Sequence, residues 1–200
     1  WWHPDSLMLL CIALTFFFLD LDDFRLGKYF YFAAAACGLA TAIKLMGFFF
    51  FLAIPLYLIL ARYKRKWEWK KLAAGAALFV LVMALVIVFS NPFLFYRAPR
   101  EEMLAIQSYK SQELSGGYQH DNSPYYALGP QYWHWTLKVS YGRPQMMLAF
   151  AGLLLVACFF GRQREINALV AAWSLPLAVY LMWFVAPKPD HYLLPLLVPV

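Results

Sequence analysis

A short basic stretch, residues 62–71, constrains the topology of this chain more than any other feature. It holds six basic residues and one acidic residue, and long apolar runs flank it at 45–61 and 72–90. Lys and Arg beside a membrane span are retained on the cytoplasmic side, so the pattern predicts a cytoplasmic loop between two spans. Trp67 and Trp69 suit the lipid–water interface, where an aromatic ring keeps its N–H hydrated. Placing this loop inside assigns a side to every other segment.

The composition is that of a membrane protein. Of the 200 residues, 63% are apolar and only 14% are charged, which is rare for a soluble domain. A formal net charge of +6 would suit nucleic acid, but the basic residues gather at span edges, so we expect no nucleic-acid partner. Cys11, Cys37 and Cys158 fall within apolar runs and form no CxxC pattern, so we expect them to pack as small residues.

The apolar runs predict an all-α, polytopic transmembrane bundle with about six spans and the start of a seventh. The predicted spans are residues 5–21, 29–43, 48–61, 72–90, 145–160, 166–184 and 191–200. The chain starts at Trp1 instead of a methionine and stops within an apolar run. We therefore expect residues 1–200 to be an internal fragment of one transmembrane domain.

Alternation of the spans agrees with the distribution of charge. With residues 62–71 inside, the turns near residues 25–28 and 162–164 also fall inside, and together the three loops hold ten of the seventeen basic residues. The segment 91–143 then becomes one external loop, far longer than a plain connection. Its charges and glycines predict a helix that opens at Glu101 and stops at Gly116, followed after Gly129 by an aromatic helix at the membrane surface. Its polar stretch 116–124 is expected to be mobile.

The ionisable residues that could carry chemistry lie at the outer ends of the predicted spans. Interfacial charges of this kind are functional candidates, whereas a transporter more often places them at the midplane. These residues are His3, Asp5, Lys44, Lys188, Asp190 and His191.

Each candidate has a structural and a chemical interpretation. Asp5 either caps a helix, or acts as a metal ligand or general acid–base group with His3 beside it. Lys44 either extends its ammonium group to the interface, or holds a lipid phosphate there. Lys188 and His191 either anchor a span at the interface, or contribute to the same phosphate site. The residues alone leave both interpretations open.

A series of short motifs occurs in order along nearly the whole chain. They are His3-Pro4-Asp5 opening a span, Gly38-Leu39-Ala40-Thr41-Ala42-Ile43-Lys44 closing one, Asn91-Pro92, Ser115-Gly116-Gly117, Gly142-Arg143-Pro144 before Gly152-Leu153, and Lys188-Pro189-Asp190-His191-Tyr192-Leu193-Leu194-Pro195. In order and sidedness, these motifs resemble the membrane domain of the family 39 glycosyltransferases. That family comprises the protein mannosyltransferase-like and aminoarabinose-transferase-like enzymes of the GT-C superfamily.

The resemblance implies an inverting enzyme of the bacterial inner membrane or an equivalent membrane, with its site facing outward. It would transfer a sugar from a polyprenyl-phosphate donor to an acceptor protein, lipid or glycan. Asp5 matches the family's second acidic position, Lys44 a lysine that faces the lipid phosphate, and His191 with Tyr192 a basic–aromatic pair. The family's essential carboxylate would precede residue 1, so we expect the fragment alone to be inactive. A divalent metal ion on Asp5, or a nearby cation, would stabilise the leaving phosphate.

Two other functions stay open at this stage. One is a secondary transporter, which the lack of mid-span ionisable residues and of a visible inverted repeat argues against. The other is a non-catalytic subunit of a membrane assembly, which the cluster of outer polar groups argues against. The motifs select neither the donor sugar, nor the acceptor, nor the oligomeric state.

Overall fold

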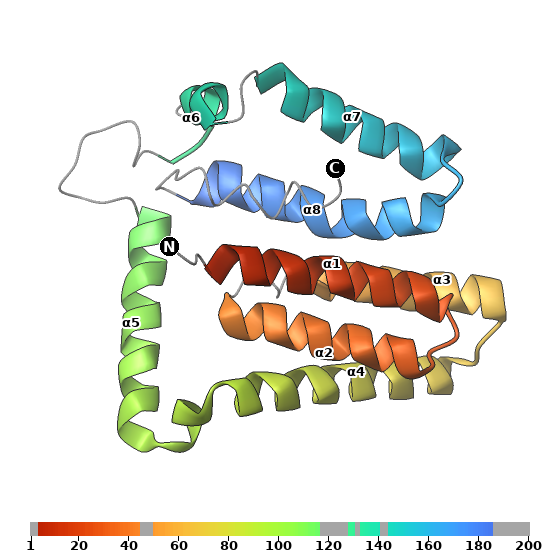
Figure 1. Cartoon of the computed structure of the whole chain (residues 1–200), viewed down its shortest axis with the longest axis horizontal. Helices are drawn as coiled ribbons and strands as arrows, with labels where there is room; N and C mark the ends of the chain where they lie inside the picture. Colours follow the sequence, from red (N-terminus) through yellow and green to blue (C-terminus); the bar gives the residue numbers. More distant parts are fainter. Residues whose placement is uncertain (1–3, 45–49, 117–127, 131–132, 141–143, 186–200) are drawn as a thin grey trace.

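The computed structural model describes residues 4–44, 50–116, 128–130, 133–140 and 144–185 (Figure 1). These residues form helices and contain no strand, which confirms the predicted all-α class. The helices are α1 (Pro4–Asp22), α2 (Lys28–Ile43), α3 (Phe50–Arg65), α4 (Trp69–Ser90), the short 3-10 helix η2 (Pro92–Phe95), α5 (Arg97–Gly116), α6 (Trp133–Ser140), α7 (Pro144–Phe160) and α8 (Arg164–Phe184).

Among the described residues, three helices are long and apolar enough to cross a membrane: α1, α4 and α8. Helix α2 and the segment Ala151–Phe160 of α7 are shorter apolar helices. Large apolar side chains stand exposed on α4 and α7, with Phe89 73% and Phe160 86% exposed, as on faces that contact lipid. These helices indicate a membrane protein. The count of six spans stays a prediction, and the expected seventh segment, 191–200, lies outside the described residues.

The helices around the basic stretch extend further than the apolar runs predict. Helix α3 continues to Arg65 and α4 starts at Trp69, so the connection between them shrinks to three residues. Basic side chains in the last turn of α3 explain the extension, because Lys and Arg are good helix formers and their charge complements the helix dipole. Lys66, with a φ of 55°, then turns the chain in the left-handed region.

Small residues on α2 allow α2 and α4 to approach closely. Helix α2 buries its small side chains, among them Ala33, Ala34 and Cys37. A Cβ atom added at Gly38 would lie 2.8 Å from the carbonyl oxygen of Met83 on α4. Backbone atoms cannot move aside as a flexible side chain can, so this crossing depends on glycine at position 38.

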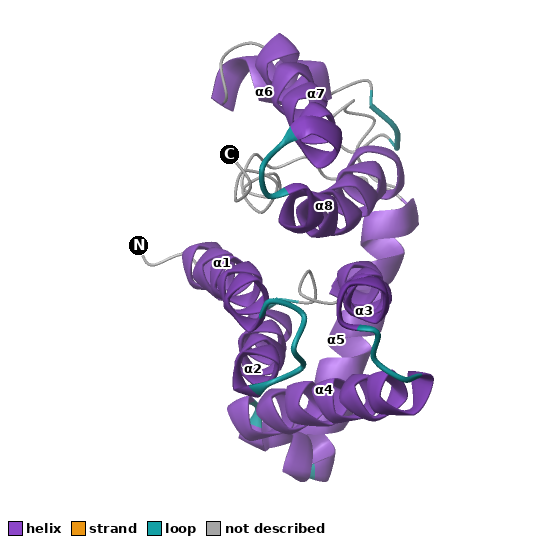
Figure 2. Cartoon of the chain, turned by 90° about the vertical axis from the view of Figure 1, so that its right-hand side faces the viewer, coloured by secondary structure: helices purple, strands orange, loops and turns teal. Residues whose placement is uncertain are grey.

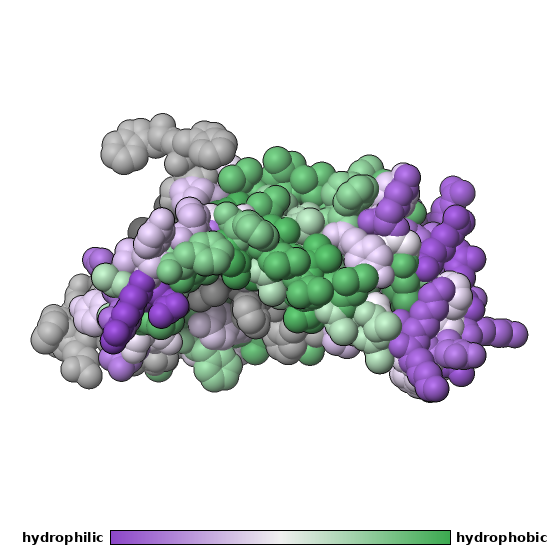
Figure 3. All heavy atoms as spheres, turned by 90° about the horizontal axis from the view of Figure 1, so that it is seen from below, coloured by the Kyte–Doolittle hydropathy of each residue, from purple (hydrophilic) through white to green (hydrophobic). Residues whose placement is uncertain are grey.

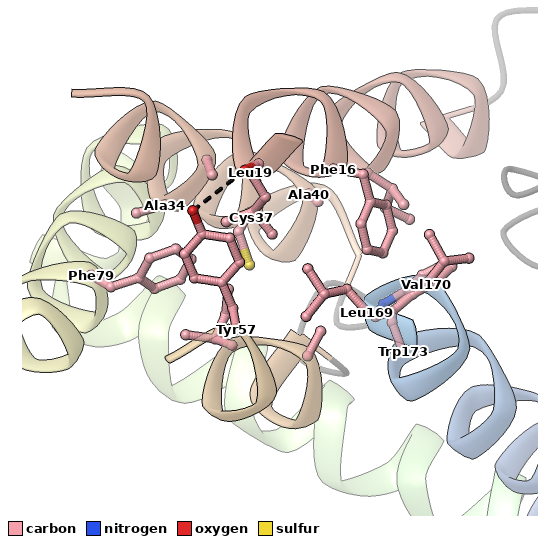
Figure 4. Packing of buried hydrophobic residues seen from close by; sticks show 14 of the residues in the cluster. Phe16, Leu19, Ala34, Cys37, Ala40, Tyr57, Phe79, Leu169, Val170 and Trp173 are labelled. Atoms are coloured by element: carbon pink, nitrogen blue, oxygen red, sulfur yellow. Dashed lines mark hydrogen bonds between the residues drawn. The ribbon is translucent and has the colours of Figure 1, made fainter. Parts of the chain in front are cut away.

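Aromatic side chains fill the core between α2, α3 and α4. Tyr57 on α3 stacks on Phe24, with ring centroids 4.6 Å apart, and on Phe30, at 5.5 Å. Phe30 also meets Phe79 of α4 at 5.0 Å. The close-up in Figure 4 shows Tyr57 beside Phe79, with its hydroxyl directed at the Leu19 carbonyl. Tyr57 of α3 therefore contacts α1, the turn between α1 and α2, and α2 itself.

Helices α7 and α8 form a second layer over the first four helices (Figure 2). Helix α8 packs against α3 and α7 and touches α1. Its Trp173 meets Phe16 of α1 edge to face, with ring centroids 5.8 Å apart (Figure 4). Trp173, Leu169 and Leu177 are fully buried, so α8 contributes a substantial apolar face to the core.

The helix connections lie at two opposite ends of the bundle (Figure 1). We name the first the basic end; it consists of the α1–α2 turn (23–28), the α3–α4 segment (62–71) and the α7–α8 turn (161–165). We name the second the Asp5–Lys44 end; α1 starts there, α2 ends there, and α5 crosses it. Figure 3 shows an apolar band between two hydrophilic ends, with hydrophilic residues most dense at the basic end.

The predicted external loop contains two of these helices. Helix α5 ends at Gly116, as predicted, but it begins at Arg97, before Glu101, because Pro99 is tolerated in a first helical turn. Helix α6 falls within the aromatic stretch that was predicted to be helical after Gly129. The segment expected to be mobile lies outside the described residues from position 117 onward. Residues 45–47, between the predicted spans 29–43 and 48–61, also lie outside them.

Candidate functional site

An ion pair joins two helices at the Asp5–Lys44 end. The ammonium of Lys44 donates a hydrogen bond to Oδ1 of Asp5, with 2.8 Å between the nitrogen and the oxygen. The Asp5 side chain is only 1% exposed, whereas that of Lys44 is 28% exposed. The carboxylate is therefore enclosed by protein, and the ammonium lies between the carboxylate and the surface.

The local sequence explains how each partner is placed. Pro4 starts α1, where its missing N–H costs no hydrogen bond, and Asp5 follows in the first turn, where a negative charge complements the helix dipole. Lys44 is the first residue after α2, with an extended backbone and its N–H bonded to the Ala40 carbonyl at 3.0 Å. Because a tight turn makes α1 and α2 antiparallel, the start of α1 meets the end of α2.

The chemistry of the Asp5–Lys44 pair follows from the charge and the donors of Lys44. Burial of a carboxylate is costly unless a cation and hydrogen bonds compensate it, and Lys44 supplies both to Asp5. An ammonium has three N–H donors, so Lys44 can hold Asp5 and still bind a second anion from the exposed side. Such a group, fixed at the end of a membrane bundle, suits an oxygen of a lipid phosphate.

The sequence placed Asp5 and Lys44 on the same side but in separate roles, and the structure brings them together. His3, Lys188, Asp190, His191 and Tyr192 lie outside the described residues, so their grouping with this pair stays a prediction. In the part of the chain that the structure describes, no three His, Cys, Asp or Glu side chains are arranged to hold a metal ion. A metal ion on Asp5 is thus also left as a prediction.

Sequence reasoning missed a second buried carboxylate, Asp22, at the basic end. Asp22 is 2% exposed and accepts hydrogen bonds from the Tyr57 hydroxyl at 2.7 Å, and from the backbone N–H groups of Leu26 and Gly27 at 2.8 Å each. The Tyr57 hydroxyl in turn accepts a bond from the N–H of Phe24, at 2.8 Å. Asp and Gly are both common turn residues, which is a local signal of a turn here, but the partner of Asp22 on α3 is 35 positions away.

This network stabilises an unfavourable backbone. In the α1–α2 turn, Asp23, Phe24 and Leu26 have φ angles of 46°, 60° and 54°, in the left-handed region that side chains other than glycine rarely adopt. The hydrogen bonds to Asp22 and Tyr57 offset the cost of this conformation. We therefore interpret Asp22 and Tyr57 as the residues that shape the turn.

The chain was compared with protein-family models, curated proteins and solved structures, and none of them matches. The described residues define the class only coarsely: an all-helical protein that has helices long and apolar enough to span a membrane, with an ion pair at one end whose carboxylate is buried.

Proposed function

We propose that this chain forms the transmembrane part of a GT-C-type glycosyltransferase that resembles family 39. It would transfer a sugar from a polyprenyl-phosphate donor to an acceptor at the outer face of the membrane. The observation that carries the proposal is the Asp5–Lys44 pair, an enclosed carboxylate with a partly exposed ammonium, at the end opposite the basic end.

The distribution of charge supports the sidedness of this proposal. Ten of the seventeen basic residues belong to the three loops of the basic end, and such loops are retained in the cytoplasm. The Asp5–Lys44 end then faces outward, on the side where the resemblance expects sugar transfer. In this arrangement α1, α2, α3, α4, α7 and α8 are the six spans, and α5 lies along the outer surface.

Lys44 would act on the leaving group. When the bond between the sugar and the phosphate breaks, negative charge grows on a phosphate oxygen, and an ammonium already held in place stabilises it without reorganisation. Asp5 would orient Lys44, since its carboxylate holds the ammonium at 2.8 Å. His191 and Lys188 are further candidates for the same phosphate.

Sugar transfer tests this proposal directly. The full-length protein that contains this segment, reconstituted in proteoliposomes, is supplied with radiolabelled polyprenyl-phosphate mannose or aminoarabinose, the two donor sugars that the family's name suggests. Lys44→Ala should raise the KM for the donor, and Lys44→Arg should recover part of the loss through its retained charge. Asp5→Asn should insert normally but lose most transfer.

The alternatives predict other outcomes. If Asp5 only stabilises the first turn of α1, Asp5→Asn should retain most of the transfer activity, because Asn is also favoured at the start of a helix. Lys110 is an exposed cation on α5 at the same end of the bundle. Lys110→Ala is therefore the matched control and should leave transfer unchanged. Wild-type KM and turnover in both Lys44→Ala and Asp5→Asn, or solute uptake without sugar transfer, would reject the proposed enzyme.

A further inference from the structure

The three loops of the basic end form one continuous surface. Lys64 at the end of α3 forms an ion pair with Glu165 of α8, with 3.0 Å between nitrogen and oxygen. The Arg65 guanidinium donates to the backbone carbonyl of Asp23 at 3.0 Å and also to its carboxylate. These contacts join segments that are far apart in the sequence, so their charges act on the same region of space.

Acidic residues at this end offset only part of the charge. The loops and the adjoining helix ends hold ten basic residues against five acidic ones, Asp20, Asp22, Asp23, Glu68 and Glu165. Three of the five are already engaged: Asp22 within its turn, Asp23 with Arg65 and Arg25, and Glu165 with Lys64. The surface therefore carries a clear excess of positive charge.

Several of the remaining cations are exposed next to the apolar helices. Lys66, Lys70, Arg162 and Arg164 are all exposed. The spans α4 and α8 begin at Trp69 and Arg164, so these cations lie within about one helical turn of an apolar helix. Trp69 is 68% exposed beside them. An exposed indole and cations at a span end are the pattern of a protein surface level with lipid headgroups.

We infer that the basic end is a binding surface for anionic phospholipid headgroups of the adjacent leaflet. The cations match the phosphates in charge, and the spans beneath hold them at headgroup level. A cluster of four to eight Lys or Arg next to a span is the pattern that anionic lipids recognise. Nucleic acid and acidic proteins fit less well, because neither is held at this depth by the apolar helices and the interfacial indole. This inference depends on neither sugar transfer nor the side of the membrane.

Lipid binding by variants of the detergent-solubilised protein tests the inference. Native mass spectrometry in detergent measures the affinity for short-chain phosphatidylglycerol, with phosphatidylcholine as the zwitterionic comparison. The wild type should prefer phosphatidylglycerol. The variant Lys66→Gln/Lys70→Gln should lose on the order of tenfold in affinity, and Arg162→Gln/Arg164→Gln a similar amount, if both loops contribute. Added salt should weaken the wild-type preference.

The matched control removes two exposed cations from the opposite end of the bundle. Arg100→Gln/Lys110→Gln on α5 has the same change in net charge and should bind phosphatidylglycerol as the wild type does. Unfolding temperatures without lipid should agree among all variants, because only exposed side chains change. The inference is wrong if the basic-end variants bind as the wild type does, if the control loses equally, or if an RNA oligonucleotide or acidic peptide displaces the lipid.

Discussion

Asp5 and Lys44 are 39 positions apart in the chain, and a single 2.8 Å ion pair ties the first turn of α1 to the residue that ends α2. The pair has a structural consequence that does not depend on catalysis. It closes the α1–α2 hairpin at one end, while the Asp22–Tyr57 network shapes the turn at the other. Both ends of the hairpin are therefore held by an enclosed carboxylate.

The first prediction separates the two partners of this pair. Lys44→Met removes the ammonium from an enclosed carboxylate and should lower the free energy of unfolding by about 3 kcal/mol. Asp5→Asn should cost less, because the partly exposed Lys44 can extend to water. The double variant should lose less than the sum of the single losses. Unfolding in detergent, monitored by tryptophan fluorescence, measures all three, with Lys110→Met as the exposed control. Additive losses would show that the two residues are not coupled.

The second prediction concerns the crossing of α2 and α4. Gly38→Ala places a methyl group 2.8 Å from a backbone oxygen, so the helices must separate, and we expect a loss of about 1–3 kcal/mol. Gly152→Ala in α7 is the control, since nothing lies within 4 Å of its Cβ position, and it should be neutral or stabilising by up to about 1 kcal/mol. Thermal unfolding of the two variants gives the comparison. Equal stability of both would mean that α2 and α4 are less closely packed than described.

The third prediction concerns the Tyr57 hydroxyl. Tyr57→Phe keeps the stacked rings but removes a donor from the buried Asp22 and an acceptor from the N–H of Phe24. We expect a loss of about 1–3 kcal/mol, because buried polar groups without partners are costly. Tyr63→Phe, at a side chain that is 79% exposed, should change the stability little. A similar stability for both variants would contradict the stabilising role that we assign to the Asp22–Tyr57 network.

The fourth prediction is the orientation in the membrane. In a variant with Cys158 replaced by serine, a cysteine at Glu68 should resist a membrane-impermeant maleimide added from outside, and one at Ser108 should react. Both positions are exposed, so a failure to react reflects the membrane barrier and not burial. Both should react after permeabilisation. The reverse pattern would place the basic end outside and contradict the proposed sidedness of the site.

The sequence by itself determined the class of this protein and much of its layout. Apolar runs and helix-ending glycines are local signals, so the all-α class and the end of α5 at Gly116 follow from them. The helix ends around residues 62–71 were less predictable, because charged residues leave the apolar pattern while they still favour a helix. The grouping of basic loops was predictable too, because successive antiparallel helices return the chain to the same end of the bundle.

Only the tertiary structure decided which side chains meet. Sequence reasoning gave Asp5 and Lys44 separate roles. A single sequence shows which residues are charged, but it does not show which of them pair across 39 positions. In the sequence, Asp22 is one of several charged residues in a turn. The structure shows that Tyr57, on another helix, bonds to it. The sequence shows a glycine at position 38, but the 2.8 Å approach to the Met83 carbonyl depends on how α2 crosses α4. Contacts between distant segments arise from packing, and packing depends on all the helices together.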